Sequence, residues 1–288
     1  MLDHLLGRFG PHFSGSRPSN RVLFSVVLGS YNRGRLLRHA IESVRDNATF
    51  ADHEIIVIDG GSTDGSLEWL LQQKDVITIV QHNRGEFRSR PIKQRSWGYF
   101  MNLGFKAAQG KFVLMISDDC ILLPKAIERG ISAFEARIAR RKKVGGVAFY
   151  FRNWPGEREY YVQHTLGGKL MVNHGLFLRE AMEKVGWADE DHYAFYKADG
   201  DLCLRLWQAG YEIIDAPGAF VEHYLDANEA VRMQNNATLD QDKRTYAARW
   251  RRLAFFSKAK QNMGRVNLSF DDPERTAELK FGGTESDI

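Results

Sequence analysis

One segment of the chain combines the pattern of a buried strand with a carboxylate and a glycine turn. Residues 55–58 are the apolar run Ile-Ile-Val-Ile, and Asp59, Gly60 and Gly61 follow directly. Short β-branched runs are typical of buried parallel strands in α/β sheets, which bind ligands at the carboxyl ends of their strands. Because glycines let the backbone turn tightly beside a ligand, the segment favours such a site. A turn capped by Asp59 is the simpler alternative.

Two further segments have the same design. Residues 22–28 form an apolar run that leads into the polar segment 29–34, and residues 111–116 lead into Asp118 and Asp119. Adjacent carboxylates repel each other unless a cation or a proton joins them. The pair therefore indicates a divalent metal held by oxygen ligands, with a solvated turn as the alternative.

The stretch from residue 21 to about 150 alternates strand and helix patterns. This alternation predicts an α/β fold in which a parallel sheet is covered by helices on both faces. We expect strands near 22–28, 54–59, 76–80, 111–116 and 145–150, and helices near 34–46, 64–72, 97–108 and 124–142.

Six motifs occur in order between about residues 22 and 225. They are Ser25–Leu28 with Tyr31-Asn32-Arg33, Asp59–Gly65, Asn102–Ala108 followed by Gly110, Ser117-Asp118-Asp119, Asp199–Leu206 with Ala209-Gly210-Tyr211, and His223. In this order and spacing the chain resembles the family 2 glycosyltransferases. The resemblance implies the GT-A fold, an α/β architecture with a Rossmann-like, mainly parallel sheet flanked by helices and an acceptor-binding C-terminal half.

We expect three parts along the chain. Residues 1–20 are rich in Gly, Pro and Ser and predict a flexible leader. Residues 21–225 would form the GT-A domain, with a nucleotide-sugar half at 21–120 and an acceptor half at 121–225. Residues 226–288 would form a helical extension with a polar tail.

The composition limits the partners and the cellular location that we expect for the protein. The net charge of +4 is small for 288 residues, and we expect no nucleic-acid partner. Two cysteines cannot build a disulfide framework, which fits the reducing cytoplasm. No apolar stretch approaches the ~20 residues that span a bilayer. An apolar face formed by Leu2, Leu5, Leu6 and Phe9 leaves peripheral contact with the inner face of the membrane open, with a frayed terminus as the alternative.

A nucleotide-sugar donor needs a pocket for its base and positive charge for its diphosphate. Tyr31 can stack on the base, and Arg33 can meet a phosphate with its planar fork. Gly61 allows a close approach of the backbone. The resemblance implies that Asp59 accepts a hydrogen bond from a uracil-like N–H. We expect Asp118 to orient the site or the donor ribose.

The resemblance also implies a divalent metal. Asp119 would bind Mg²⁺ or Mn²⁺, which bridges the diphosphate and stabilises the leaving group. His223 matches a histidine that joins the metal or the diphosphate in relatives. The family often has an acidic residue two positions before the metal aspartate, where this chain has Ser117. This departure weakens a two-carboxylate chelate but leaves Asp119 in place.

The resemblance places the catalytic base at Asp199, with Asp201 as a helix cap or buttress. His192 is a rival base nearby in the sequence. The basic segment 84–95 could close over a diphosphate, recognise an anionic acceptor, or be an ordinary solvated loop. Several aromatic residues could either stack on sugar rings or pack in the core. They are Trp154, Tyr160, Tyr161, Trp187, Tyr193, Phe195 and Tyr196.

These features predict an inverting glycosyltransferase that moves a sugar from a nucleoside diphosphate sugar, most plausibly UDP-linked, to a glycan or lipid-linked acceptor. Two other classes stay open: a nucleotidyltransferase and a non-catalytic nucleotide-sugar-binding module. The segment after the first strand carries neither the Gly-x-Gly-x-x-Gly fingerprint of dinucleotide binding nor the Lys-Ser/Thr of a P-loop. Both of those motifs are excluded.

Overall fold

The computed structural model of the chain describes residues 22–224, 233, 235–250 and the backbone strand 265–268. The expected leader at 1–20 and the tail after Asp271 lie outside these residues. The helices are α1 (Gly34–Asn47), α2 (Ser66–Leu70), α3 (Trp97–Ala107), α4 (Ala126–Ala139), α5 (Arg179–Lys184), α6 (Ala198–Gln208) and α8 (Leu239–Trp250), with a 3₁₀ turn at Leu166–Gly168. The strands are β1 (Phe24–Ser30), β2 (His53–Asp59), β3 (Val76–Val80), β4 (Glu86–Phe87), β5 (Arg90–Pro91), β6 (Phe112–Met115), β7 (Cys120–Leu122), β8 (Val144–Trp154), β9 (Tyr160–Thr165), β10 (Lys169–Leu170), β11 (Gly175–Leu178), β12 (Glu212–Tyr224) and β13 (Arg265–Leu268).

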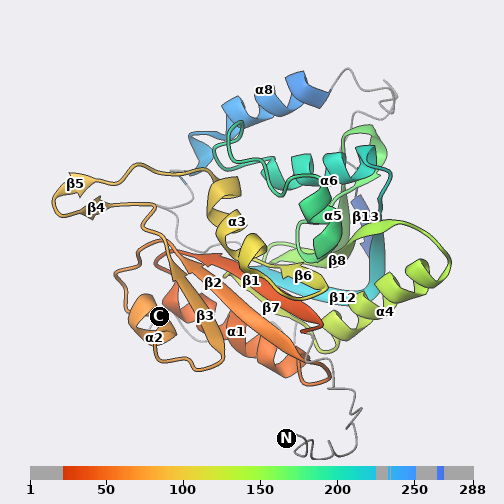
Figure 1. The fold of residues 1–288 in the computed structure, drawn as a ribbon, viewed down its shortest axis with the longest axis horizontal. Helices are drawn as coiled ribbons and strands as arrows, with labels where there is room; N and C mark the ends of the chain where they lie inside the picture. The colour runs from red at the N-terminus through yellow and green to blue at the C-terminus, as the bar shows by residue number, and fades with distance from the viewer. Residues whose placement is uncertain (1–21, 225–232, 234, 251–264, 269–288) are drawn as a thin grey trace, which may run out of the picture.

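One large sheet forms the centre of the molecule (Figure 1). Its main path runs in the order β10-β9-β8-β11-β6-β1-β2-β3. The strands β6, β1, β2 and β3 are parallel neighbours, whereas β11 runs antiparallel between β6 and β8. β12 extends the sheet beside β8 in parallel and pairs with the short β7 in the opposite direction. The expected α/β fold with a mainly parallel central sheet is confirmed, and antiparallel strands complete its second half.

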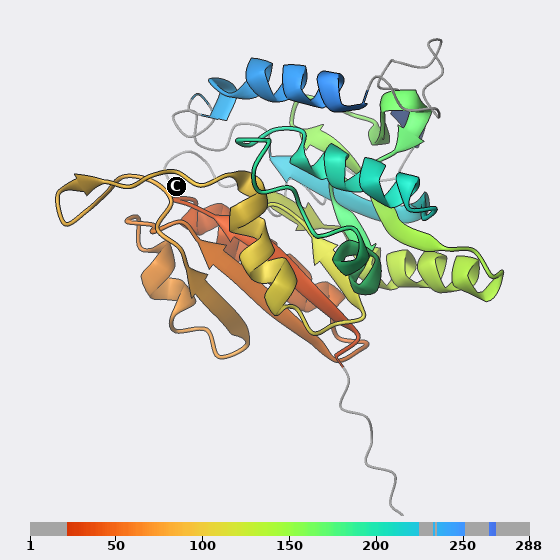
Figure 2. The same cartoon turned by 45° about the horizontal axis from the view of Figure 1, so that its top comes forward.

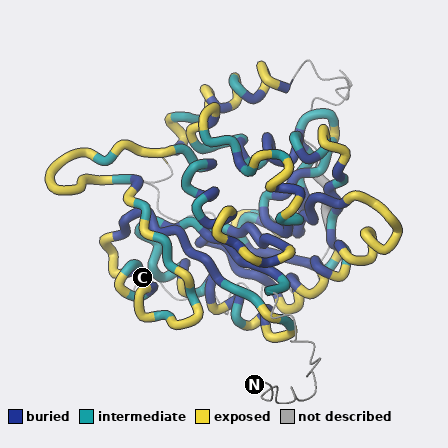
Figure 3. Tube along the Cα trace, viewed as in Figure 1, coloured by how far each residue is buried: buried dark blue, intermediate teal, exposed yellow. Residues whose placement is uncertain are grey.

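Helices cover both faces of the sheet because alternate side chains of each strand point to opposite faces. Val26 and Val57 pack with α1 and α4 on one face, while Val27 and Ile58 pack with α3, α5 and α6 on the other. The central strands are accordingly buried, whereas the edge strand β3, the hairpin of β4 and β5, and the outer surfaces of helices and loops are exposed to solvent in part (Figure 3). This double cover explains why the strands are continuous apolar runs.

The helices and strands expected up to residue 150 are all present, most of them with shifted ends. The strand predicted at 76–80 has those bounds, while the helix predicted at 64–72 is only the five-residue α2. Among the described residues, no helix combines the length and the apolar character needed to cross a bilayer.

α8 lies against α6 and against the chain that leads into α6 (Figure 2). Tyr246 and Trp250 of α8 form a small buried cluster with Tyr193, Ala198 and Leu204. The described part of the expected C-terminal extension therefore packs directly on the sheet domain.

Candidate active site

A cavity of about 490 Å³ lies at the carboxyl ends of β1, β2 and β6. Tyr31, Arg33, Asp118, Asp199 and His223 all line it. These residues come from four separate parts of the chain. Parallel strands end at the same edge and bring the strand-end residues together, while Asp199 reaches them from the start of α6. Five of the predicted site residues therefore share one cavity.

Arg33 bridges the two adjacent carboxylates. Its Nη1 lies 2.9 Å from Asp118 Oδ1 and 2.7 Å from Asp119 Oδ2. Burial raises the pKa of Asp118, and the nearby charge of Arg33 only partly offsets this. Burial also opposes ionisation of Asp119, but attraction from His223 and Arg33 outweighs it and lowers the pKa of Asp119. The guanidinium thus partly neutralises the acidic pair for which the sequence predicts a divalent metal.

His223 turns its Nε2 toward Asp119. Asn153 donates from Nδ2 to Glu157 Oε2 at 2.8 Å, so its Oδ1 faces His223 Nδ1 at 2.7 Å. The Glu157 carboxylate and the Asn153 amide oxygen can only accept, so His223 donates from Nδ1 to Asn153. That Nε2 lies 3.5 Å from Asp119 Oδ1.

This donor set fits a small divalent cation. A carboxylate oxygen and an imidazole nitrogen suit Mn²⁺, and the carboxylate suits Mg²⁺. Cys120 lies close enough for its sulfur to be within 4.8 Å of both groups. Burial raises the pKa of the Cys120 thiol well above its usual range, so the thiol stays protonated and is a poor ligand.

Asp59 is turned into the loop that follows β2. It is fully buried, and its Oδ1 accepts from the backbone N–H groups of Gly61 and Ser62 at 2.8 Å each. Its Oδ2 accepts from the Ser62 hydroxyl at 2.6 Å. Gly61 has a φ of +90°, and a Cβ there would lie 2.4 Å from the ring of His82. Asp59 and Gly61 shape this turn, and it is their neighbour Gly60 that lines the cavity.

Tyr31 lies at the mouth of the same region. The guanidinium of Arg84 is 5.8 Å from the centre of its ring, and both side chains line the cavity. With an aromatic ring beside a cation, one ligand could stack its base on the ring and place its phosphate at the cation.

Asp199 lies in the first turn of α6 and lines the cavity. Its Oδ1 accepts from the backbone N–H of Gly200 at 2.7 Å. Burial raises the pKa of Asp199. The rival His192 is 59% exposed at its side chain, pairs with Asp189, and is not among the lining residues. Geometry therefore favours Asp199 over His192 as a group that can reach a ligand.

Asp201, two residues later, is a fully buried hub. Its Oδ1 accepts from Tyr193 Oη and Trp250 Nε1, and its Oδ2 accepts from Arg205 Nε. Sequence reasoning identified a buttress here but not its partners. Trp250 is 49 positions away, and no local pattern marks it.

The basic segment 84–95 forms a hairpin of β4 and β5 that projects from the body (Figures 1 and 2). Arg84 and Arg95 at its base line the cavity, whereas Arg88 and Arg90 are exposed on the hairpin itself. The segment thus connects the cavity to a basic surface.

Of the seven aromatic residues, three line the cavity and the other four, Tyr160, Tyr193, Trp154 and Trp187, belong to or pack against core clusters. Tyr161, Phe195 and Tyr196 line the cavity. Tyr160 and Tyr193 are almost completely buried and pack in the core.

Residues 25–185 match the glycosyl transferase family 2. An uncharacterized glycosyltransferase of Nostoc sp. (strain PCC 7120) is 35% identical over 113 residues, which cover 38% of this chain and 32% of that protein. The chain therefore spans only about a third of that relative. The family match ends before α6, so Asp199 and His223 lie beyond it.

Two solved structures resemble the fold. The mannosyltransferase PcManGT from Pyrobaculum calidifontis, in complex with GDP-Man and Mn²⁺, has a TM-score of 0.54 at 18% identity over 81% of this chain and 66% of that one. S. aureus TarS 1-349, in complex with UDP-GlcNAc, has a TM-score of 0.53 at 15% identity over 73% of this chain and 61% of that one. These likenesses confirm the expected GT-A architecture.

Proposed function

The chain belongs to the family 2 glycosyl transferases, and from this premise we propose that it is an inverting glycosyltransferase. It moves a sugar from a nucleoside diphosphate sugar, in our proposal a UDP-sugar, to an acceptor hydroxyl. The observation that carries the proposal is the single cavity that joins Tyr31, Arg33 and Asp118 at the strand ends with Asp199 at the start of α6. A donor and an acceptor group can meet there.

The donor diphosphate would lie beside Arg33 and the pair Asp118-Asp119. Asp119 and His223 would hold Mg²⁺ or Mn²⁺, and Asp118 would orient the donor ribose. The metal, when bound, neutralises the diphosphate and the charge that grows on the leaving nucleoside diphosphate. The Asn153 contact supports this assignment, because it fixes the His223 ring through Nδ1 and directs Nε2 at Asp119.

Tyr31 would stack on the nucleotide base. Asp59 and Gly61 would hold the turn beside that base, and a direct hydrogen bond from Asp59 to the base is part of the proposal. Such a bond requires a second lone pair, since both carboxylate oxygens already accept within the turn.

Asp199 would take the proton of the acceptor hydroxyl as that oxygen attacks the anomeric carbon. The bond from this carbon to the diphosphate oxygen breaks, and its electron pair leaves with the nucleoside diphosphate. Attack from the opposite side inverts the configuration. The raised pKa of Asp199, caused by burial, supports the assignment because a carboxylate in this state is a stronger base than a solvated one.

The acceptor would be a glycan or a lipid-linked sugar placed against Tyr161, Phe195 and Tyr196. The basic hairpin at 84–95 suits an anionic group on the acceptor or its carrier. In this proposal the enzyme is cytoplasmic and meets a lipid-linked acceptor at the inner face of the membrane.

A panel of nucleotide sugars tests the proposal. With Mn²⁺ or Mg²⁺ present, we expect release of UDP, and NMR of the product should show an inverted anomeric centre. Release of pyrophosphate from a nucleoside triphosphate would instead indicate a nucleotidyltransferase. Tight binding of UDP-sugars without any release, with every acceptor tried, would indicate a binding module.

A further inference from the structure

The segment at 235–250 closes over the loop Asp189–Lys197, which leads into α6. This loop contains no helix or strand, yet Phe195, Tyr196 and Lys197 at its end line the cavity. Lys197 has a φ of +73°, and no side chain caps the helix that follows. The path of the chain into Asp199 is therefore not set by regular secondary structure, and contacts from other segments help to hold it.

Asp242 of α8 supplies three of those contacts. It is 1% exposed. Its Oδ1 accepts from the backbone N–H of Ala194 at 2.8 Å, and its Oδ2 accepts from Phe195 at 2.9 Å and Tyr196 at 2.8 Å. Bonds from N–H groups to a buried carboxylate are stronger than neutral ones. One side chain thus ties down three consecutive residues of the loop.

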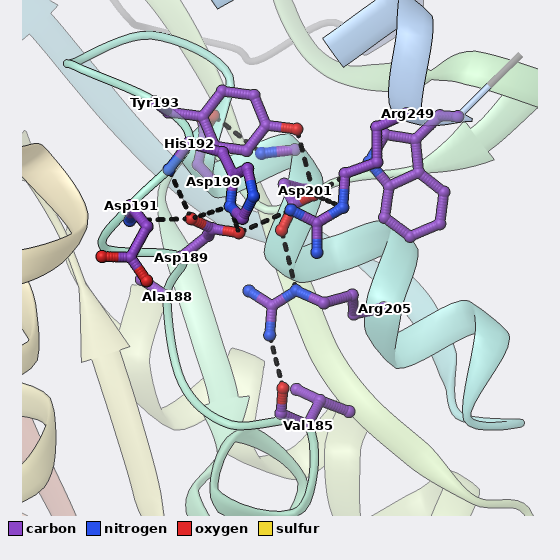
Figure 4. A network of polar contacts seen from close by, with 12 residues as sticks. Val185, Ala188, Asp189, Asp191, His192, Tyr193, Asp199, Asp201, Arg205 and Arg249 are labelled. Carbon is purple, nitrogen blue, oxygen red and sulfur yellow. Dashed lines mark hydrogen bonds and ion pairs between the residues drawn. The ribbon is translucent and has the colours of Figure 1, made fainter. Parts of the chain in front are cut away.

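The far end of α8 holds the start of α6 (Figure 4). Trp250 Nε1 donates to Asp201 Oδ1 at 2.8 Å, and Arg249 Nε lies 3.4 Å from the same oxygen. Arg249 Nη1 also donates to Asp189 Oδ2 at 2.5 Å. Arg249 therefore connects the first residue of the loop to the carboxylate two positions after Asp199.

The segment reaches the donor side as well. Asn236 accepts from Tyr196 Oη at 2.7 Å, and Asn235 accepts from Arg84 at 2.5 Å. Arg84 in turn lies over Tyr31. The 235–250 segment consequently touches side chains from both sides of the cavity.

We propose that Asp242, Arg249 and Trp250 are positioning residues that hold the loop Asp189–Lys197 and place Asp199 for proton transfer. None of them lines the cavity. The inference rests on the proposed function, because it assumes that Asp199 is the base. A small displacement of such a group, on the order of 1 Å, costs about a hundredfold in rate.

The test compares Asp242→Asn with Asp240→Asn, a matched change in the same first turn of α8. The Asp240 side chain is 87% exposed and has only a long contact of 3.9 Å with Lys243. We expect Asp242→Asn to lower turnover of the best donor about a hundredfold. Its affinity for UDP, measured by calorimetry, should stay that of the parent, and Asp240→Asn should match the parent in both.

Amide hydrogen exchange reports on the loop independently of activity. In Asp242→Asn the amides of residues 194–196 should exchange about tenfold faster, the loss of roughly one hydrogen bond, while the central sheet keeps its protection. Trp250→Phe, which removes only the N–H donor to Asp201, should lower turnover about tenfold by the same reasoning.

The inference would be overturned if Asp242→Asn turned over as fast as the parent. It would also be overturned if the variant lost UDP affinity as strongly as turnover, because that would indicate general damage to the protein. Unchanged exchange at residues 194–196 would overturn it too. A different result would contradict the proposed function itself: the parent protein would release no nucleoside diphosphate from any donor. The inference, which rests on that function, would then be lost as well.

Discussion

The two sides of the cavity, which we propose bind the donor and the acceptor, are built in different ways. On the donor side, Tyr31 directly follows β1 and Asp118 comes three residues after the end of β6, so the direction of two parallel strands delivers them to the site. On the acceptor side, Asp199 follows an irregular loop in which three backbone N–H groups donate to Asp242. A site residue at a strand end is placed by topology, whereas one after a loop is placed by particular distant partners.

The largest effect is expected on the acceptor side, at Asp199. Asp199→Asn keeps the size of the side chain but removes the base, so turnover should fall about a hundred- to ten-thousandfold while UDP affinity persists. Steady-state rates and calorimetry measure the two quantities. Because burial raises the pKa of the charged Asp199, the neutral amide should not lower the melting temperature. A variant as fast as the parent would remove Asp199 as the base.

On the donor side, Asp119→Ala should lose most turnover because it removes the carboxylate of the proposed metal site, which is expected to contribute several kcal/mol. Turnover of the parent should depend on Mn²⁺ or Mg²⁺ and stop in a chelator. Asn153→Ala is a useful companion, since it should weaken metal binding about tenfold or more while leaving the sheet intact. Full activity in a chelator would contradict the metal assignment.

Asp201→Asn should separate stability from catalysis on the acceptor side. The change leaves Arg205, whose side chain is 14% exposed, without its charged partner. Breaking a buried ion pair costs about 3 kcal/mol or more, so we expect a clear loss in urea unfolding experiments. Asp199→Asn, two residues away, should show no such loss. Equal stability of the two variants would mean that Asp201 is only a helix cap.

Asp59→Ala probes the donor turn with a smaller effect. The buried carboxylate organises Gly61 and Ser62, so its removal should weaken UDP binding by about 1 to 3 kcal/mol in calorimetry. Ser62→Ala removes one of these bonds and should cost less. If both variants bind UDP like the parent, the turn does not contribute to the base pocket.

The smallest effect is a shift of the pH profile. A base must be deprotonated to act, and burial raises the pKa of Asp199, so turnover should fall as the pH decreases through a value above that of an ordinary aspartate. Trp250→Phe, which loosens the hub beside it, should move this acid limb toward lower pH. If turnover of the parent instead falls at the pH where a solvated aspartate titrates, Asp199 is not buried during turnover.

Much of the first half of the fold could be predicted from the sequence. The strands around Ile56 and Val113 and the helices after them have strong local periodicity, and their expected positions are confirmed. The second half was harder because β12, 13 residues long, carries buried polar residues such as Glu222, which pairs with Arg152. A buried pair of this kind interrupts the apolar pattern that marks a strand.

The sequence by itself determined the order of strands and helices and the arrival of Tyr31, Asp118 and Asp119 at one edge, because hydrophobic periodicity is local and parallel strands share a direction. Only the tertiary structure decided that Arg33 bridges the acidic pair, that Asp59 turns into its own loop, and that α8 holds the path to Asp199. These arrangements depend on distances between residues far apart in the chain: Arg33 and Asp118 are 85 positions apart, and Ala194 and Asp242 are 48 apart. Hydrogen bonds and ion pairs of this kind form only after the sheet and its helices have packed, so no local pattern encodes them.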